Sequence, residues 1–417
     1  MSFLILWTKS STVRHISYHF SQLAEVKNYL KQNIGNQITI LDMDVENIDL
    51  LTLADIIIKK KIQAVACYVS TENLRSSFEA AMFIKHIDPQ IKLLAYGRMP
   101  CLLPEYFVKS EFDAVCFSGD KELAIKDYFM AVKKKTETNS ISGIAHLCDK
   151  KLIYGPVGKY LPGDKWGVPE LDTDIPFETY FSIKKKRRIT ITISRGCPFD
   201  CPHCLIPITA GHQERRRDLT VLKKYLHTIY KNVNYIKLYS PNFTLNKKYV
   251  YTFCNIIKSD FPEMQWECTT RVDLLDDNLL IETMAKSGCK QITLGIESIN
   301  EIDLNNVNKK HLYNFQKLDK IINLMNDNKI KLKACIMIGM PTQTKESVYN
   351  TIDYLVKKGS VIRPTIYTPY QDLNCNMSIS DIEQYNRKTL YDNSSELSYK
   401  QQLQLVTNVM NYQSILK

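Results

Sequence analysis

Short runs of β-branched and aromatic residues alternate with longer segments of helical period along this chain, and that alternation limits the folds open to it. In the first third, five strand-like runs are separated by segments such as Leu23–Gln32 and Leu74–Lys85. Strands that alternate with helices indicate a parallel sheet with helices on both faces. The expected strands are Phe3–Trp7, Ile38–Asp42, Ala64–Val69, Ile91–Tyr96 and Asp113–Phe117.

A second series begins at residue 189, where Ile189, Ile191 and Ile193 alternate with threonines. Six parallel strands, each followed by a helix, predict a partial barrel with its functional residues at the C-terminal strand ends. The other expected strands are Tyr235–Tyr239, Trp266–Thr269, Gln291–Gly295, Leu332–Ile338 and Ile362–Tyr367.

Residues 136–188 are rich in glycine and proline, which indicates a surface linker or a small hairpin. The sequence therefore predicts an α/β protein in four parts. These are a flavodoxin-like doubly wound domain over 1–135, a linker over 136–188, a partial (β/α)6 barrel over 189–375 and a helical tail over 376–417.

The 417 residues carry 55 Lys and Arg against 44 Asp and Glu, a formal net charge of +11. This surplus favours an acidic or polyanionic partner, although lysine-rich surfaces also arise for solubility alone. No apolar run reaches the roughly 20 residues of a membrane span, and Phe3–Trp7 is too short for the core of a signal peptide. We therefore expect a cytoplasmic protein with no membrane partner.

Three of the 12 cysteines stand together, at Cys197, Cys201 and Cys204, directly after the first barrel strand. Three thiolates within eight residues can hold three irons of a [4Fe–4S] cluster and leave the fourth iron open to a small molecule. A zinc site completed by His203 and His212 is the alternative, but paired CxxC spacings are lacking. Most of the other nine cysteines are expected in the core.

The Cx3CxφC spacing at the end of the first barrel strand resembles the signature of the radical S-adenosylmethionine (SAM) superfamily. Segments 295–298 and 338–344 resemble that family's GIES strand end and GxP turn, and 240–243 and 270–273 resemble strand ends of its cobalamin-associated subgroup. The resemblance implies that Cys197, Cys201 and Cys204 bind a [4Fe–4S] cluster. It also implies cofactor contacts from His203, Asn242, Arg271, Glu297, Ser298, Gly339 and Pro341.

The resemblance further implies a mechanism. SAM chelates the open iron, and electron transfer from the cluster, which a donor such as flavodoxin or ferredoxin reduces, breaks a C–S bond. The resulting 5′-deoxyadenosyl radical takes a hydrogen atom from a substrate carbon. Arg215, Arg216 and Arg217 follow the cysteine loop, where they either meet a substrate carboxylate or phosphate or are solvated at the start of a helix.

The first domain resembles the cobalamin-binding domains that are fused to many radical SAM enzymes, over segments 69–71, 81–85, 97–105 and 113–122. It departs from them in three places. No Asp-x-His-x-x-Gly motif is present, the usual Gly-Gly pair reads Gly97-Arg98, and the Gly-Glu-Gly-Glu turn reads Gly119-Asp-Lys-Glu122. The domain is therefore expected to keep the fold, while cobalamin binding stays open.

Two radical reactions fit the sequence. The altered cobalamin segments favour L-to-D epimerisation in a ribosomal precursor peptide, as in the proteusin-type radical SAM epimerases that the layout resembles. Cys375, just past the sixth strand, would then be the catalytic hydrogen-atom donor, unless it is an incidental loop cysteine. The alternative is a cobalamin-dependent C-methyltransferase.

Two further functions are weaker. A methylthiotransferase acting on tRNA would suit the positive charge, but the front-domain cysteine triad and a C-terminal β-barrel are missing. Nucleic acid is therefore not expected as a partner. A cluster-bearing scaffold or sensor without catalysis would leave the strand-end motifs unexplained.

Overall fold

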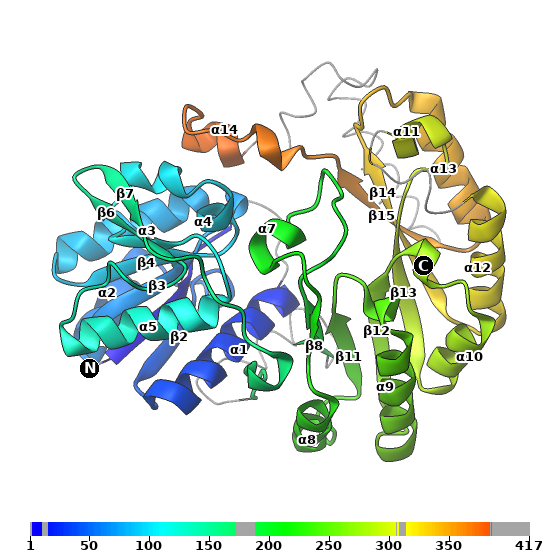
Figure 1. Ribbon diagram of the computed structural model, residues 1–417, viewed down its shortest axis with the longest axis horizontal. Coiled ribbons are helices and arrows are strands. Elements are labelled where there is room, and N and C mark those ends of the chain that lie inside the picture. Colours follow the sequence, from blue (N-terminus) through cyan, green and yellow to red (C-terminus); the bar gives the residue numbers. More distant parts are fainter. Residues whose placement is uncertain are drawn as a thin grey trace.

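The computed structural model describes residues 2–10, 16–171, 188–305, 307, 314–383 and 385. Their strands form two large sheets side by side, each with its own helices (Figure 1). Both are α/β layers, so the predicted fold class is confirmed.

The front sheet has seven strands in the order β2-β1-β3-β4-β5-β6-β7, and the first five are parallel. Helices α1 and α5 cover one face, and α2 and α3 cover the other. The strands are β1 (Ser2–Trp7), β2 (Ile38–Asp42), β3 (Ile62–Tyr68), β4 (Lys92–Tyr96) and β5 (Ala114–Cys116). The helices are α1 (Ile16–Ile34), α2 (Leu50–Lys60), α3 (Leu74–Ile87), α4 (Arg98–Leu102) and α5 (Lys121–Lys134).

The crevice at the centre of this sheet is closed by aromatic rings. Doubly wound sheets bind ligands outside the C-terminal strand ends where the strand order reverses, which here is between β1 and β3. Trp7 ends β1 and Tyr68 ends β3, and their rings stack with centroids 3.9 Å apart. Tyr96, at the end of β4, packs edge-on against Tyr68. All three side chains are buried, so their rings fill the crevice between β1 and β3.

The segment after α5 completes the front sheet. Strands β6 (Ile144–Cys148) and β7 (Lys151–Tyr154) form a hairpin, and β6 pairs antiparallel with β5. For residues 136–188 the sequence indicates either a surface linker or a small hairpin. The structure has a hairpin in this segment. Residues 172–187 lie outside the described part of the chain.

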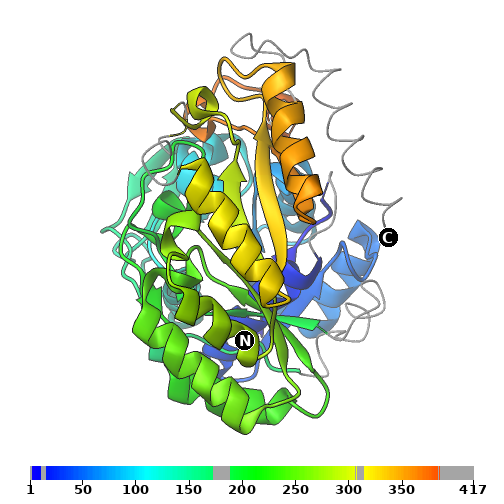
Figure 2. The ribbon, with the colours of Figure 1, turned by 90° about the vertical axis from the view of Figure 1, so that its right-hand side faces the viewer.

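The second sheet has six parallel strands in the order β8-β11-β12-β13-β14-β15, as predicted for a partial barrel. Its helices lie outside the curved sheet (Figure 2). The strands are β8 (Arg188–Thr192), β11 (Tyr235–Tyr239), β12 (Gln265–Thr270), β13 (Cys289–Glu297), β14 (Lys331–Ile338) and β15 (Val361–Ile366). The helices are α8 (Leu219–Ile229), α9 (Lys247–Asp260), α10 (Asn278–Lys286), α11 (Glu301–Asn305), α12 (Phe315–Asp327) and α13 (Lys345–Lys357).

Most of the predicted tail lies outside the described residues. Its described part includes α14 (Ile379–Glu383), which packs on α3 of the front domain. The backbone N–H of Arg75 donates a hydrogen bond to the Glu383 carboxylate at 2.9 Å. Among the described helices, none combines the length and the apolar character needed to cross a membrane.

Candidate functional site

The cysteine loop begins at the end of the first barrel strand and folds back on itself. Strand β9 (Ser194–Arg195) pairs antiparallel with β10 (Arg215–Arg216), so the loop closes at its base. Gly196 has φ +79°, and a side chain there would meet the carbonyl oxygen of Gln213 at 2.1 Å, so only glycine fits. Cys197 is buried, whereas Cys201 and Cys204 are half-buried.

Two of the predicted cofactor residues hold this loop. The side-chain amide of Asn242 donates a hydrogen bond to the Cys197 sulfur at 3.3 Å. The guanidinium of Arg271 lies 3.6 Å from the ring centroid of Phe199, within the loop, and is fixed by Asp273 at 2.9 Å. Asn242 therefore contacts a cluster ligand, and Arg271 orients the loop that carries it.

Four further predicted residues lie at the ends of β13 and β14. Glu297 is buried in a left-handed conformation (φ +65°), beside a shift in strand register. The Ser298 hydroxyl is buried and donates to Asp303 at 2.7 Å, so it supports the turn. The backbone N–H of Gly339 donates to Gln343 at 2.8 Å, and Pro341 follows in the same turn.

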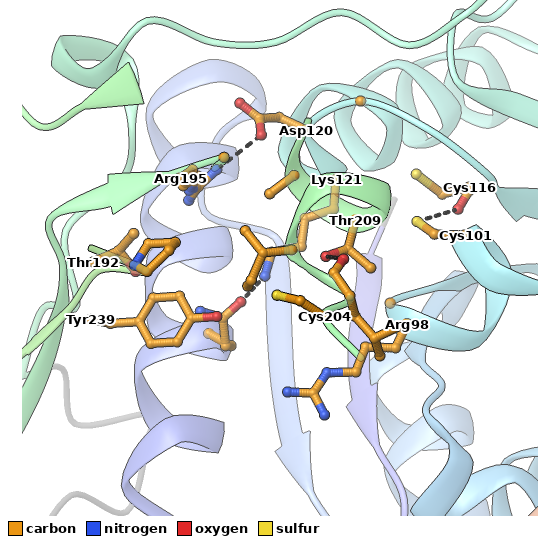
Figure 3. Close-up of a pocket in the computed structure, with 18 of the residues that line it drawn as sticks. Arg98, Cys101, Cys116, Asp120, Lys121, Thr192, Arg195, Cys204, Thr209 and Tyr239 are labelled. Carbon is orange, nitrogen blue, oxygen red and sulfur yellow. Dashed lines mark hydrogen bonds and ion pairs between the residues drawn. The ribbon is translucent and has the colours of Figure 1, made fainter. Parts of the chain in front are cut away.

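A cavity of about 340 Å³ lies between the cysteine loop and the C-terminal edge of the front sheet. Figure 3 shows Thr192 and Tyr239 of the barrel on one side, Cys101 and Cys116 of the front domain on the other, and Cys204 between them. The other lining residues are Gln22, Tyr68, Gly97, Arg98, Gly119, Asp120, Lys121, Glu122, Ser194, Arg195, Gly196, His203, Leu205, Ile206, Thr209, Ala210, Pro241 and Tyr370. His203 and Cys204 thus face the front domain, and both domains contribute to this one site.

Cys375 is not among the residues that line this cavity. It follows β15 and lies beside the front domain, where its carbonyl accepts a hydrogen bond from Lys109 at 2.5 Å. Its role as a hydrogen-atom donor stays a prediction that the geometry does not favour. Cys101 and Cys116 are among the nine scattered cysteines, most of which were expected in the core, yet both line the cavity, and no sequence motif distinguished them.

The cysteine loop is attached to the front domain by a buried ion pair. Arg195, two residues before Cys197, makes two hydrogen bonds to Glu122 at 2.7 and 3.0 Å. Burial alone would raise the pKa of Glu122, but Arg195 and Lys121 outweigh it and lower that pKa to about 2. Glu122, the last residue of the altered Gly119–Glu122 turn, thus attaches the cysteine loop to the front domain.

Arg215 and Arg217 belong to the same network, whereas Arg216 pairs within its own segment, so the sequence interpretations of the three as a substrate clamp or as solvated charge are wrong. Arg215 pairs with Asp120 at 2.6 Å, and the fully buried Arg217 lies 3.4 Å from Glu25. Arg216 pairs with Glu214 at 2.7 Å.

Trp166 is the apolar centre of the network. Its ring lies 4.5 Å from the guanidinium of Arg195 and 5.7 Å from those of Arg215 and Arg217. Cation–π contacts of this kind add to the ion pairs where water is excluded. The acids come from α1 and α5 or its N-cap, so the network fixes the two sheets relative to each other.

The donors present suit an iron–sulfur cluster better than a single zinc ion. Within the described ranges, no three His, Cys, Asp or Glu side chains lie close enough to hold one metal ion. His212 lies at the surface, 3.2 Å from Asp200. Thiols spread around a loop can each bind a different iron of a [4Fe–4S] cluster.

Comparison with known families agrees with this assignment. Residues 191–355 match the model of the Radical SAM superfamily, which confirms the predicted superfamily for the barrel. Proteins of this superfamily use a [4Fe–4S] cluster and SAM, and Cys197, Cys201 and Cys204 are the residues that would hold the cluster here.

Individual relatives cover most of the chain at low identity. An anaerobic magnesium-protoporphyrin IX monomethyl ester cyclase of Rubrivivax gelatinosus is 24% identical over 87% of this chain and 68% of its own. An uncharacterised methyltransferase of Pyrococcus horikoshii is 25% identical over 80% and 73%. Among solved structures, the radical SAM methyltransferase TsrM of Kitasatospora setae, with tryptophan and a SAM analogue bound, shares the fold. Its TM-score is 0.74 at 16% identity, over 89% of this chain and 75% of that one.

Removing the hydrogen bond to the Cys197 sulfur should lower the reduction potential of the cluster. An N–H···S bond favours the more negative, reduced state, and a bond worth ~0.5–1.5 kcal/mol corresponds to about 20–65 mV. Asn242→Ala should show this shift in a redox titration followed by electron paramagnetic resonance. Asn246→Ala, which removes only the cap of α9, should leave the potential unchanged. Equal potentials in all three proteins would contradict the assignment.

Breaking the Glu122–Arg195 pair should destabilise the protein strongly. Glu122→Ala leaves a buried arginine without its bidentate partner, which costs about 3–5 kcal/mol. Denaturant unfolding measures the loss. As a control, Asp127→Ala removes the partner of Lys126 in an ion pair near the surface, and should cost at most about 1 kcal/mol. Similar losses in the two variants would show that the network is not an anchor.

Proposed function

We propose that the protein is a radical SAM methyltransferase that binds a corrinoid in the cavity between the front domain and the cysteine loop. The single observation that carries this proposal is the shape of the site. One cavity is lined both by Cys204 of the loop and by Gly97 and Gly119 at the C-terminal edge of the front sheet. A methyl carrier at that place would lie beside the cluster.

The lining residues fit a corrin ring. Apolar and aromatic side chains such as Leu205, Ile206 and Tyr239 form the walls, and Gln22 and Lys121 supply polar groups suited to the amide side chains of a corrinoid. The stack of Trp7 on Tyr68 closes the central crevice, so the fit is to the ring and not to a nucleotide tail inserted there. Arg98, which stands where the related cobalamin-binding domains usually have the second glycine, also disfavours an inserted nucleotide tail.

In this proposal the cluster and SAM supply a radical that removes a hydrogen atom, and a methylated corrinoid supplies the methyl group that the substrate carbon receives. The chain itself orients and encloses these groups. Asn242 and Arg271 hold the cysteine loop, and the Glu122–Arg195 pair keeps the front domain against it. Electrons would come from a donor such as flavodoxin or ferredoxin.

The relatives support methyl transfer over the epimerisation that the sequence favoured. One is named a methyltransferase, and TsrM is a methyltransferase with the same two-part fold. A second structure of TsrM, with cobalamin and a [4Fe–4S] cluster bound, has a TM-score of 0.72 to this chain. No relative described here is named an epimerase.

The position of Cys101 favours a second candidate function, epimerisation of a ribosomal peptide. Cys101 lines the cavity, and burial raises the pKa of its thiol to about 12, so it keeps its proton near neutral pH. A protonated thiol is the form that donates a hydrogen atom. Cys101 is better placed for this step than Cys375.

Corrinoid retention tests the proposal. After anaerobic reconstitution with hydroxocobalamin and desalting, the wild type should retain cobalamin absorption bands beside those of the cluster. Thr209→Trp should lose them, because the larger ring fills the cavity, whereas Ile208→Trp, on the exposed face of the same helix, α7 (Ile206–Ala210), should retain them.

An iron–sulfur spectrum without cobalamin in the wild type would contradict the proposal. The second candidate would then be favoured if the product formed in deuterium oxide carried deuterium and Cys101→Ala abolished its formation.

A further inference from the structure

Four basic side chains point into the barrel below the cysteine loop. They are Arg188 on β8, Lys237 on β11, Lys333 on β14 and Arg363 on β15. Successive residues of a strand face opposite sides of a sheet. The neighbours of these four, Ile189, Ile236, Leu238, Leu332, Ala334 and Ile362, are buried in the core beneath the outer helices. The basic side chains therefore face the concave side, and we call them the barrel cations.

The barrel cations are close to the reaction site. Lys237 stands two residues before Tyr239, which lines the cavity beside the cysteine loop, so it lies roughly 6.6 Å further down the same strand face. In the register of the sheet, Lys237 is opposite Glu267 on β12. Lys333 is opposite Thr293 on β13. A substrate that reaches below the strand ends would meet these side chains.

Among the described residues, Glu267 is the carboxylate that faces the barrel cations, and it is already paired with Arg188. Both oxygens of Glu267 lie 3.2 Å from Arg188, and one also accepts hydrogen bonds from Tyr235 at 3.0 Å and Gln291 at 3.4 Å. Glu267 is buried, so this pair is close to neutral as a unit. The positive charge of the remaining barrel cations is not balanced by it.

The side chains of Lys237, Lys333 and Arg363 have no hydrogen bond or ion pair with any residue that the structure describes. Lys237 and Lys333 are half-buried, and Arg363 is exposed. Lysines are seldom buried in proteins without a partner, because removing the ammonium from water is costly. Burial, together with Arg188, Lys333 and Arg363, lowers the pKa of Lys237 to about 8 despite Glu267. Among the described residues, the inside of the barrel thus carries more positive charge than the single Glu267 carboxylate balances.

We propose that Lys237, Lys333 and Arg363 bind an anionic group of the substrate, a carboxylate or a phosphate, inside the barrel. The inference rests on the proposed function, to which it adds a substrate class. SAM is not the expected ligand, because its own carboxylate is expected at the open iron of the cluster. The site would select substrates whose acidic group lies deeper in the barrel than the carbon that reacts, on the side away from the cysteine loop.

Calorimetric titration of the full-length, reconstituted protein at low salt tests this, with glutarate and inorganic pyrophosphate as probes. At least one probe should bind, and Lys237→Met and Lys333→Met should each weaken it about ten- to hundredfold, the loss of one charge-assisted contact. Lys290→Met is the matched control, since Lys290 is an exposed lysine on the opposite face of β13 and should leave the affinity unchanged. Lys237→Arg keeps the charge and should stay within a few fold of the wild type.

The two probes separate the chemistries, because preference for glutarate indicates a carboxylate and preference for pyrophosphate a phosphate. Binding that is absent, or equal in Lys237→Met, Lys333→Met and wild type, would overturn the inference. Formation of 5′-deoxyadenosine and retention of cobalamin, measured on the same samples, report separately on the proposed function, so either can fail without the other.

Probe binding should weaken as pH rises through about 8, where Lys237 loses its proton. The charged groups that face it are Glu267 on β12, Arg188 on β8, Lys333 on β14 and Arg363 on β15. Burial and Arg363 also lower the pKa of Lys333, so loss of its proton would weaken binding in the same direction. Titrations at pH 7 and 9 should show the loss in the wild type and a smaller loss in Lys237→Arg. An affinity independent of pH would contradict a role for Lys237.

Discussion

The ion pair between Glu122 and Arg195 is the contact on which the rest of the structure depends. Arg195 stands two residues before Cys197, so this pair joins the cluster loop to the front domain. Buried charges are tolerated only with good geometry, and a displaced front domain would leave several of them unpaired. Around Trp166 the same holds for Arg215 with Asp120 and Arg217 with Glu25. The network thus determines how the two sheets meet.

That arrangement creates the site. The cavity has one wall from each domain, so its shape depends on the network between them. The closed crevice between Trp7 and Tyr68 leaves the cavity as the place where the front domain can receive a ligand beside the cluster. Below it, the barrel cations extend the site into the second sheet. A methyl carrier, a radical source and an acidic substrate would then meet around the cysteine loop.

Local patterns predicted the strands and the barrel, and they single out Cys197, Cys201 and Cys204 as candidate cluster ligands, because each of these features depends on residues near one another in the sequence. The network could not be predicted in this way. Arg195 and Glu122 are 73 residues apart, and Arg217 and Glu25 are 192 apart, so three consecutive arginines looked like solvated charge or a substrate clamp. Cys101 looked like a core cysteine for the same reason, since the wall opposite it comes from the other domain. The alternation that turns the barrel cations to one face of their strands can be read from the sequence. That three of their side chains have no partner among the described residues can be seen only in the structure.

Every proposed step depends on the cysteine loop holding a [4Fe–4S] cluster with an iron open to SAM. Electron paramagnetic resonance of the reduced, reconstituted protein, recorded with and without SAM, tests it most directly. We expect the signal of a reduced [4Fe–4S] cluster that changes when SAM is added and that is lost in Cys197→Ala. A signal that SAM leaves unchanged, or one that persists in Cys197→Ala, would contradict it.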